Sequence, residues 1–405
     1  MEKQTQNFLN LVSSFVWDTT ADVKDADWKI LFHLAKIHNL IPAVYHAAYR
    51  LPAFSEASDS VKKQFMESAL YQSGAQYMRT QEFLSVYDEF AENGIHPRVL
   101  KGLVCRSLYP DPDMRISCDE DLWITREDLP ICDRILRSRG YQPDLEDITP
   151  LLDTIQEATY SNHTLTLELH MDHPFGTDDS VRLKMNQIFE NSYNQTMCVS
   201  IQEQRIYTLS PTEHCLFLFT HLYKHFLYGG VGIRQILDLL LFLNRYENEI
   251  DFDRINSAVI LLEGETFYAA VLEIGRRYLG FSDLKSPGIS PDTEPLLEDL
   301  IESGCFGNTS RFQRLAATFV AADSIHKNTG KPQILTLLFP SASRIYHNYP
   351  FLVKRPWLVP AAWAMRIFKF VKELLLSDRK LAAKSIRRGK KRTEILKKYK
   401  TILRR

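Results

Sequence analysis

The 405-residue sequence contains no hydrophobic run that approaches the ~20 consecutive apolar residues of a membrane-spanning helix. It has no internal repeat, and its one low-complexity segment is a basic stretch at the C-terminus. The first residues, MEKQTQNFLNLVSSF, lack the apolar core and the small-residue cleavage site of a secretory signal. These absences disfavour a transmembrane protein and a secreted one.

Cysteine is scarce, and no two cysteines show the paired spacing of metal-binding residues. Scattered cysteines are typical of reduced thiols, so we expect a cytoplasmic protein. The six are Cys105, Cys118, Cys132, Cys198, Cys215 and Cys305.

Net charge is almost absent, since the formal charge is −1, but its distribution is uneven. Residues 379–405 carry thirteen Lys or Arg against one acid, a local charge of +12, which leaves −13 on residues 1–378. We interpret 379–405 as a solvated basic tail, because it has few apolar side chains to bury. Weak contact of this tail with nucleic acid or an anionic membrane surface is the alternative.

The apolar content, 45% of residues, is enough to build two or three domains. Residues 1–94 predict a helical region, in which Asp27 caps a helix over 28–39 and a long helix follows over 61–92. The long helix has an apolar stripe that we expect to pack inward. Its members are Phe65, Ala69, Leu70, Tyr77, Leu84, Tyr87, Phe90 and Ala91.

Strand signals appear only in residues 95–209, where short β-prone segments surround a predicted helix over 125–140. Such a segment predicts a small mixed sheet with one buried face. The expected strands cover 95–100, 122–124, 163–170 and 205–209.

From residue 210 the pattern is helical again. The run Ser210-Pro211-Thr212-Glu213 predicts a capping box with proline at the first helical position. Further helical stretches are predicted over 253–279, 294–303 and 309–325. We expect the aromatic segment 351–376 to pack into the core, with a position on a membrane surface as the alternative. The predicted fold class is therefore α+β. A small mixed β-sheet domain (95–209) is flanked by N-terminal helices (1–94) and a C-terminal helical domain (210–378), followed by the basic tail (379–405).

Two acids stand at the start of the second predicted strand, in the run Asp119-Glu120-Asp121. Alternate side chains of a strand share a face, so Asp119 and Asp121 are expected to point the same way. Two close carboxylates repel unless a cation lies between them, and Mg²⁺ is the usual one. The acid pair therefore predicts a metal site, with a solvated acidic turn as the alternative.

A further acid lies on the polar face of the predicted strand over 163–170. Leu165, Leu167 and Leu169 alternate with Glu168 and His170, so the two polar residues share the face opposite the leucines. Glu168 is a candidate third carboxylate, with solvation as the alternative. His170 is expected to contact substrate or to orient a neighbouring ligand.

His221 and His225 share one face of the helix that begins near residue 210, which is a spacing seen in zinc sites. There is no His-Glu-x-x-His pattern, and His214 lies about 10.5 Å along the helix axis from His221. Zinc is therefore disfavoured. Substrate contact and hydrogen-bonded histidines within an interface both remain open.

Several short motifs together resemble the bacterial family of uncharacterised nucleotidyltransferases. This family is a branch of the superfamily that includes DNA polymerase beta and the aminoglycoside nucleotidyltransferases. The resemblance covers most of residues 30–350. The motifs are Asn39-Leu40-Ile41-Pro42, Leu100-Lys101-Gly102, Leu108-Tyr109-Pro110-Asp111-Pro112, Arg115, Asp119-Glu120-Asp121-Leu122, Leu167-Glu168-Leu169-His170, His221, Lys224, His225, Asp238 and Leu338-Phe339-Pro340-Ser341.

The resemblance implies transfer of a nucleoside monophosphate from a nucleoside triphosphate (NTP), ATP included, to an acceptor hydroxyl. It implies Mg²⁺ or Mn²⁺ held by Asp119, Asp121 and Glu168, at an active site between the sheet domain and the C-terminal helices. It implies nucleotide contacts from Lys101, Gly102 and Arg115. Residues expected to contact substrate or to orient other site residues are His170, His221, Lys224, His225 and Asp238.

The sequence departs from the superfamily in three ways, one of which is that more residues than usual separate the phosphate turn from the acid pair. Lys101-Gly102 replaces the usual Gly-Ser at the phosphate turn, and Glu120 stands where an apolar residue is usual, which we interpret as an exposed face. We expect the acceptor to be a small molecule or a sugar. The alternatives are an inactive nucleotide-binding or regulatory module and a toxin–antitoxin-like enzyme that modifies a protein.

Overall fold

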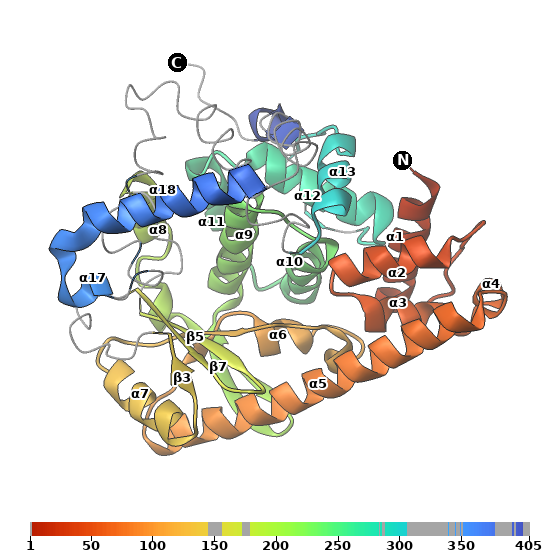
Figure 1. Cartoon of the computed structure of the whole chain (residues 1–405). Helices are drawn as coiled ribbons and strands as arrows, with labels where there is room; N and C mark the ends of the chain where they lie inside the picture. The colour runs from red at the N-terminus through yellow and green to blue at the C-terminus, as the bar shows by residue number, and fades with distance from the viewer. Residues whose placement is uncertain are drawn as a thin grey trace.

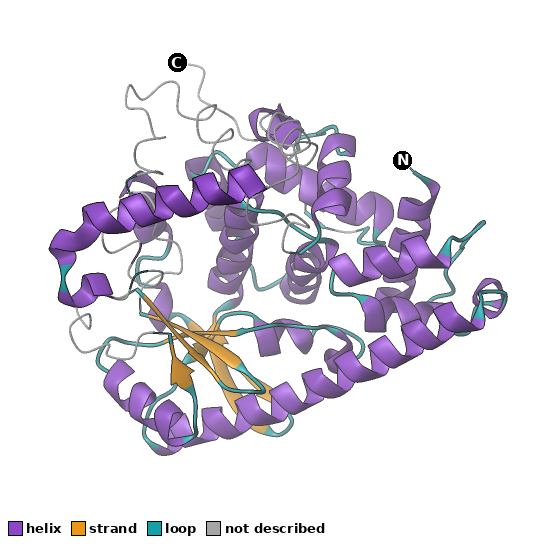
Figure 2. Ribbon diagram, in the orientation of Figure 1, coloured by secondary structure: helices purple, strands orange, loops and turns teal. Residues whose placement is uncertain are grey.

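A computed structural model describes residues 2–144, 156–171, 179–282, 284–285, 288–305, 339, 345, 349, 351–376, 391–392 and 394–399. The helix predicted over 309–325 lies outside these residues. Within them, none of the helices has the length and apolar content needed to cross a membrane. The fold is of the predicted α+β class, with the strands gathered in one region and helices around them (Figure 2).

The N-terminal region is helical, as predicted. Asp27 accepts hydrogen bonds from the backbone N–H groups of Lys29 and Ile30 and so caps α2. The long helix α5 ends at Asn93, and Gly94 follows with φ +76°. The helices are α1 (Lys3–Trp17), α2 (Trp28–Ile37), α3 (Ile41–Ala48), α4 (Pro52–Ser55) and α5 (Asp59–Glu92).

The main sheet has five strands in the order β1-β2-β5-β4-β3, and each predicted strand overlaps an observed one. Strands β2 and β5 run parallel, while the other neighbours in this sheet are antiparallel. A separate hairpin is formed by β6 and β7. The strands are β1 (Arg98–Val99), β2 (Glu120–Trp123), β3 (Gln142–Pro143), β4 (Glu157–Ser161), β5 (Thr166–His170), β6 (Thr196–Ile201) and β7 (Gln204–Leu209).

Short helices connect these strands. Helix α6 follows β1 and precedes β2 in the chain, and it begins directly after Lys101; α7 packs beside the sheet (Figure 1). The connecting elements are α6 (Gly102–Arg106), η1 (Pro112–Met114), α7 (Leu129–Ser138), α8 (Asp179–Ile188) and η3 (Ser192–Asn194).

The C-terminal region is helical from residue 211. The stretch predicted over 253–279 forms two helices, because Glu263 adopts φ +58° and Gly264 follows it. The Ser210 side chain makes no capping hydrogen bond, so that part of the capping-box prediction is wrong. The helices are α9 (Pro211–Tyr228), α10 (Ile233–Tyr246), α11 (Phe252–Leu261), α12 (Glu265–Tyr278), α13 (Glu294–Ser303), α17 (Phe351–Lys354), η4 (Pro356–Leu358) and α18 (Val359–Leu376).

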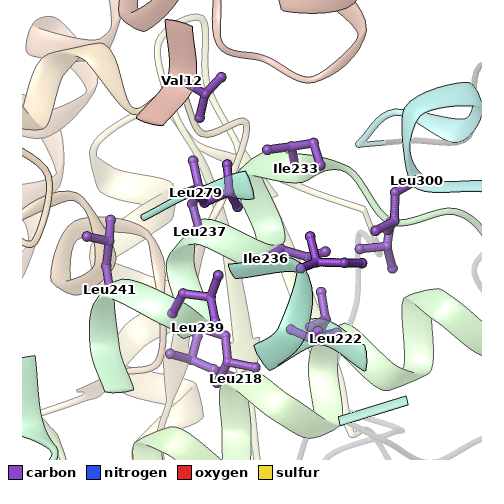
Figure 3. Close-up of a cluster of buried hydrophobic side chains, with 14 of the residues drawn as sticks. Val12, Leu218, Leu222, Ile233, Ile236, Leu237, Leu239, Leu241, Leu279 and Leu300 are labelled. Carbon is purple, nitrogen blue, oxygen red and sulfur yellow. The ribbon is translucent and has the colours of Figure 1, made fainter. Parts of the chain in front are cut away.

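Two large hydrophobic clusters hold most of these elements together. One joins the N-terminal helices to the C-terminal helices, and Figure 3 shows Val12 of α1 on the side of the cluster where Leu279 and Leu237 lie. The other lies between one face of the sheet and helices α5 and α7, and includes Leu122, Leu167 and Leu169. The described side chains of the segment 351–376 belong to neither, and Trp357 and Phe368 are each 70% exposed, so the prediction that it packs into the core is wrong. Because the terminal helical regions share a core, the division into separate domains stays a prediction.

The basic tail is not a solvated arm where it is described. Ile395, Leu396 and Tyr399 are buried, and the Tyr399 hydroxyl accepts a hydrogen bond from the backbone N–H of Leu296. Ion pairs join Lys391, Arg392 and Lys398 to acids on or beside α13, namely Asp292, Glu298, Asp299 and Glu302. The prediction of a solvated tail is therefore wrong for residues 391–392 and 394–399.

Candidate active site

Two neighbouring strands bring the predicted acids together. In the parallel pair β2–β5, Asp121 lies directly opposite Glu168, and Trp123 lies opposite His170. Paired residues share a sheet face, so Asp121, Glu168 and His170 line one face while the leucines of both strands fill the core on the other. Asp119 immediately precedes β2.

The polar groups of this face are close enough to share one cation. Ligand atoms of Asp121, Glu168 and His170 all lie within 4.8 Å of one another, and among the described residues this is the group of His, Cys, Asp and Glu that could hold a metal ion. His170 Nε2 lies 3.1 Å from Asp121 Oδ1. Asp121 and His170 are almost fully buried, whereas the Glu168 side chain is 28% exposed and open to a ligand.

Lys101 supplies a positive charge to the same acids. Its ammonium lies 2.8 Å from Asp121 Oδ2 and 3.9 Å from Asp119 Oδ1. This places Asp119 beside the cluster, although it is not one of the three residues within 4.8 Å. Lys101 precedes α6, so the turn between β1 and α6 positions it over the end of β2.

The electrostatics favour a cation at this site. Burial alone would raise the pKa of Asp121, but Lys101 and His170 overcome burial and hold it below the ordinary value. Burial and the neighbouring acids Asp121, Glu157 and Asp119 raise the pKa of Glu168 to about 8. Asp121 Oδ2 is buried, and its charged partner is the Lys101 ammonium 2.8 Å away. An oxygen in this position fits a cation ligand.

The donor set also fits a hard divalent ion. Carboxylate oxygens are the ligands that Mg²⁺ and Mn²⁺ prefer, and one imidazole is compatible with Mn²⁺. His170 also contacts Glu157, since its Nδ1 lies 3.4 Å from Glu157 Oε2. Both predicted roles of His170, ligand contact and orientation of Asp121, are compatible with this geometry.

Helix α9 adds nitrogen atoms opposite the acids. Lys101 Nζ lies 3.5 Å from His221 Nε2, which in turn lies 3.0 Å from His225 Nε2. Burial, Lys101 and Lys224 lower the pKa of His225 to about 4, and burial and Lys101 lower the pKa of His221 well below its ordinary value. Both rings are therefore neutral at pH 7. Zinc stays disfavoured, because His214 is buried and contacts Thr208 Oγ1 at 2.9 Å.

Lys224 is the second cation within electrostatic reach of the acids. Burial lowers its pKa, and Lys101 lowers it further, while Glu157 and Glu168 act in the opposite direction. Nearby Glu157 and Glu168 favour the charged form of Lys224, and a lysine ammonium in this position is suited to an anionic substrate group.

The structure shows why position 102 requires a glycine, which the sequence did not reveal. Its φ is +45°, and a Cβ at this position would lie 1.8 Å from Glu120 Oε2. The same carboxylate oxygen accepts the N–H of Leu103 at 2.8 Å, and Glu120 also pairs with Arg106. Glu120 is 1% exposed, so its predicted exposed face is wrong. A nucleotide contact by Gly102 stays a prediction.

Arg115 and Asp238 lie in a different cluster. The Arg115 guanidinium donates to both Asp238 oxygens, at 3.1 and 2.6 Å, and the Tyr109 hydroxyl donates to Asp238 at 2.8 Å. Both partners are buried. Arg234, four residues before Asp238 on α10, lies farther from its carboxylate, at 3.8 Å. Asp238 therefore fixes Arg115 between η1 and α10, and their nucleotide and substrate roles stay predictions.

Sequence reasoning missed Glu157, the fourth acid near the site. It lies opposite His170 on β4, and its side chain is 45% exposed. The alternation of Glu157, Thr159 and Ser161 with buried Ala158 and Tyr160 would have indicated this face.

Carboxylates on adjacent strands of a mixed sheet, with basic residues nearby, are compatible with metal-assisted chemistry on phosphate groups. The family model described as "Uncharacterised nucleotidyltransferase" matches residues 24–280, and the chain belongs to that family of nucleotidyltransferase enzymes. The matched range contains every site residue named above. No curated protein and no solved structure matches the chain at a significant level.

Proposed function

We propose that the chain transfers a nucleoside monophosphate from an NTP to an acceptor hydroxyl, with a divalent metal ion bound by Asp119, Asp121 and Glu168. The observation that carries this proposal is the register of β2 and β5, which sets Asp121 opposite Glu168 beside Lys101. A bound Mg²⁺ or Mn²⁺ would supply charge neutralisation at the triphosphate.

Other residues are assigned to phosphate binding, to proton transfer and to the positioning of Asp121. Lys101 and Lys224 carry positive charge toward the phosphate oxygens, and a phosphate oxygen near Lys101 would draw its ammonium away from Asp121. In its ionised form, which a bound cation would favour, Glu168 is suited to accept the proton of the acceptor hydroxyl. His170 holds Asp121 Oδ1 in place. His221 and His225 are neutral and offer hydrogen bonds without adding charge.

The acceptor is proposed to be a small molecule or a sugar, and a protein acceptor is the alternative outcome of the test. The test supplies each of the four NTPs, labelled at the α-phosphate, with Mg²⁺ or Mn²⁺ and a pool of cellular small molecules. Transfer of label with pyrophosphate release is expected for the unaltered chain. Label on protein alone would favour the protein-modifying alternative.

Matched variants make this test specific. Asp121→Asn and Asp119→Asn are expected to abolish transfer while the protein stays folded, because each removes a ligand charge from a site with excess acid. Asp59→Asn alters a side chain that is 99% exposed at the start of α5, and it should transfer like the unaltered chain. Near-normal turnover of Asp121→Asn would refute the metal assignment. NTP binding without any transfer would indicate a regulatory module.

A further inference from the structure

The middle of helix α5 presents large apolar side chains to solvent. The exposed fractions are 42% for Met66, 66% for Leu70, 78% for Tyr71, 48% for Tyr77 and 58% for Met78. The prediction that Leu70 and Tyr77 pack inward is therefore wrong. Figure 1 shows α5 along the rim of the molecule, where one side of the helix faces away from the other elements.

The opposite face of the same stretch is already used by the fold. Phe65 and Ala69 are buried among the N-terminal helices, and Gln76 accepts the N–H of Ser117 at 2.8 Å. Exposed residues at positions 66, 70, 74, 77 and 78 follow the 3–4 spacing of a helix–helix seam. The exposed stripe (Met66, Leu70, Tyr71, Gly74, Tyr77, Met78) is therefore a second packing face that the described part of the chain does not cover.

The exposed stripe is complementary to a copy of itself. Gly74 lies near its centre, and no atom lies within 4 Å of the position its Cβ would take, so a second helix can approach closely there. In an antiparallel pair with its two-fold axis at Gly74, each residue faces the one equally far on the other side. Leu70 then meets Met78 of the copy, and Tyr71 meets Tyr77.

The charges along the stripe permit this pairing. In the same register, Glu67 faces Gln81 of the copy and Lys63 faces Ser85, so no charge meets its like in the turns that flank the stripe. Asp59 faces Glu89 only near the helix ends, about 22 Å along the axis from the crossing point. A nucleic-acid partner is disfavoured, because the one arginine of the stretch, Arg79, donates inward to the carbonyls of Thr164 and Ser117.

The area is sufficient for a dimer. At roughly 200 Å² for a large apolar side chain, the five exposed side chains would bury roughly 600 Å² per chain. Both chains together would bury roughly 1,200 Å², which lies at the lower end of specific protein interfaces. We propose that two copies of this chain form a dimer through α5, antiparallel and crossing at Gly74.

Sedimentation velocity of the full chain between about 1 and 100 μM tests the interface. We expect a dimer for the unaltered chain and a monomer for Leu70→Glu/Tyr77→Glu, with unchanged far-UV circular dichroism. Ile260→Glu on α11 is the matched control, since that side chain is 59% exposed, and it should remain dimeric. A monomeric unaltered chain at 100 μM, or a dimeric double variant, would overturn the proposal.

Disulfide trapping tests the register. In a background with the exposed Cys118 and Cys198 replaced by serine, Gly74→Cys should form a covalent dimer upon mild oxidation. Glu67→Cys should not, because the two copies of residue 67 would lie about 21 Å apart along the helices. Efficient cross-linking at residue 67, or none at residue 74, would refute the crossing at Gly74.

Discussion

At the scale of single residues, the site shifts the pKa values of two carboxylates that lie opposite each other in opposite directions. Asp121 contacts Lys101 and His170, and these contacts stabilise its ionised form against the effect of burial. Glu168 is close to three other acids, which favour its protonated form. A site that holds one proton among several acids gains most from a bound cation, because the cation allows all of them to ionise.

The shifted pKa of Glu168 predicts how stability depends on pH. Between the ordinary pKa of 4.5 and the folded value of about 8, the folded chain holds a proton that the unfolded chain releases. The free energy of unfolding should therefore fall as pH rises through this range, by up to about 1.4 kcal/mol per pH unit from this group. Urea unfolding between pH 5 and 8 in the presence of a chelator measures this dependence of the free energy of unfolding on pH.

Glu168→Gln is the test variant for this dependence, because it cannot ionise. Its free energy of unfolding should fall less steeply with pH than that of the unaltered chain, and added Mg²⁺ should stabilise the unaltered chain most at high pH. Asp59→Asn should keep the original slope. Equal slopes in Glu168→Gln and the unaltered chain would show that Glu168 has an ordinary pKa in the fold.

At the scale of elements, β2 and α6 are joined by Glu120. Its carboxylate accepts the N–H of Leu103, the second residue of α6, and pairs with Arg106 of the same helix, so the strand that carries Asp121 fixes the helix that follows Lys101. Gly102 permits this approach, because any Cβ would meet the carboxylate. The relative position of Lys101 and Asp121 therefore depends on Glu120 and Gly102.

Gly102→Ala is expected to destabilise the fold by more than about 2 kcal/mol. A left-handed backbone costs roughly 1–2 kcal/mol for a non-glycine residue, and displacing buried Glu120 adds to this. Gly94→Ala is the control, since Gly94 has φ +76° but no atom within 4 Å of its Cβ position, and it should show the backbone cost alone. Chemical denaturation compares the two.

A double variant isolates the contact with Glu120. In the Glu120→Ala background, Gly102→Ala should cost about as much as Gly94→Ala, because the overlapping oxygen is gone. If Gly102→Ala costs the same with and without Glu120, the close approach is not what requires glycine.

The sequence predicted the helices and strands better than the ion pairs that buried side chains form. Periodicity located α2, α5, β5 and the polar face of Glu168, because alternation and capping are local properties. The partner of Glu120 is Arg106, and the partner of Arg115 is Asp238, 123 positions away. No local pattern encodes such pairs, so the burial of Glu120 and the position of Arg115 required the structure.

At the scale of the whole molecule, the uneven charge is partly neutralised by folding. The basic tail meets acids on or beside α13, and Arg392 lies over the ring of Phe226 on α9 at 4.6 Å. Phe226 is adjacent to His225 in sequence. The tail therefore packs against the helix that carries the basic side of the site.

Removing residues 391–405 is expected to lower the melting temperature, because Ile395, Leu396 and Tyr399 are buried. The exposed ion pairs should matter less, since such pairs contribute roughly 0–1 kcal/mol. Leu396→Ala should therefore destabilise more than Lys391→Ala or Lys398→Ala, and salt should change these differences little. Differential scanning calorimetry of these four altered chains and the unaltered chain measures the differences in melting temperature. An unchanged melting temperature after truncation would show that the tail is a solvated arm, as the sequence predicted.

The central claim is that the acids of β2 and β5 form a divalent-metal site that serves nucleotidyl transfer. The most direct measurement is a Mn²⁺ titration followed by electron paramagnetic resonance, with the unaltered chain, Asp121→Asn, Glu168→Gln and Asp59→Asn. Saturable Mn²⁺ binding is predicted for the unaltered chain and for Asp59→Asn, at least tenfold weaker binding for the two site variants, and competition by Mg²⁺. Equal Mn²⁺ affinity in all four chains would contradict the claim.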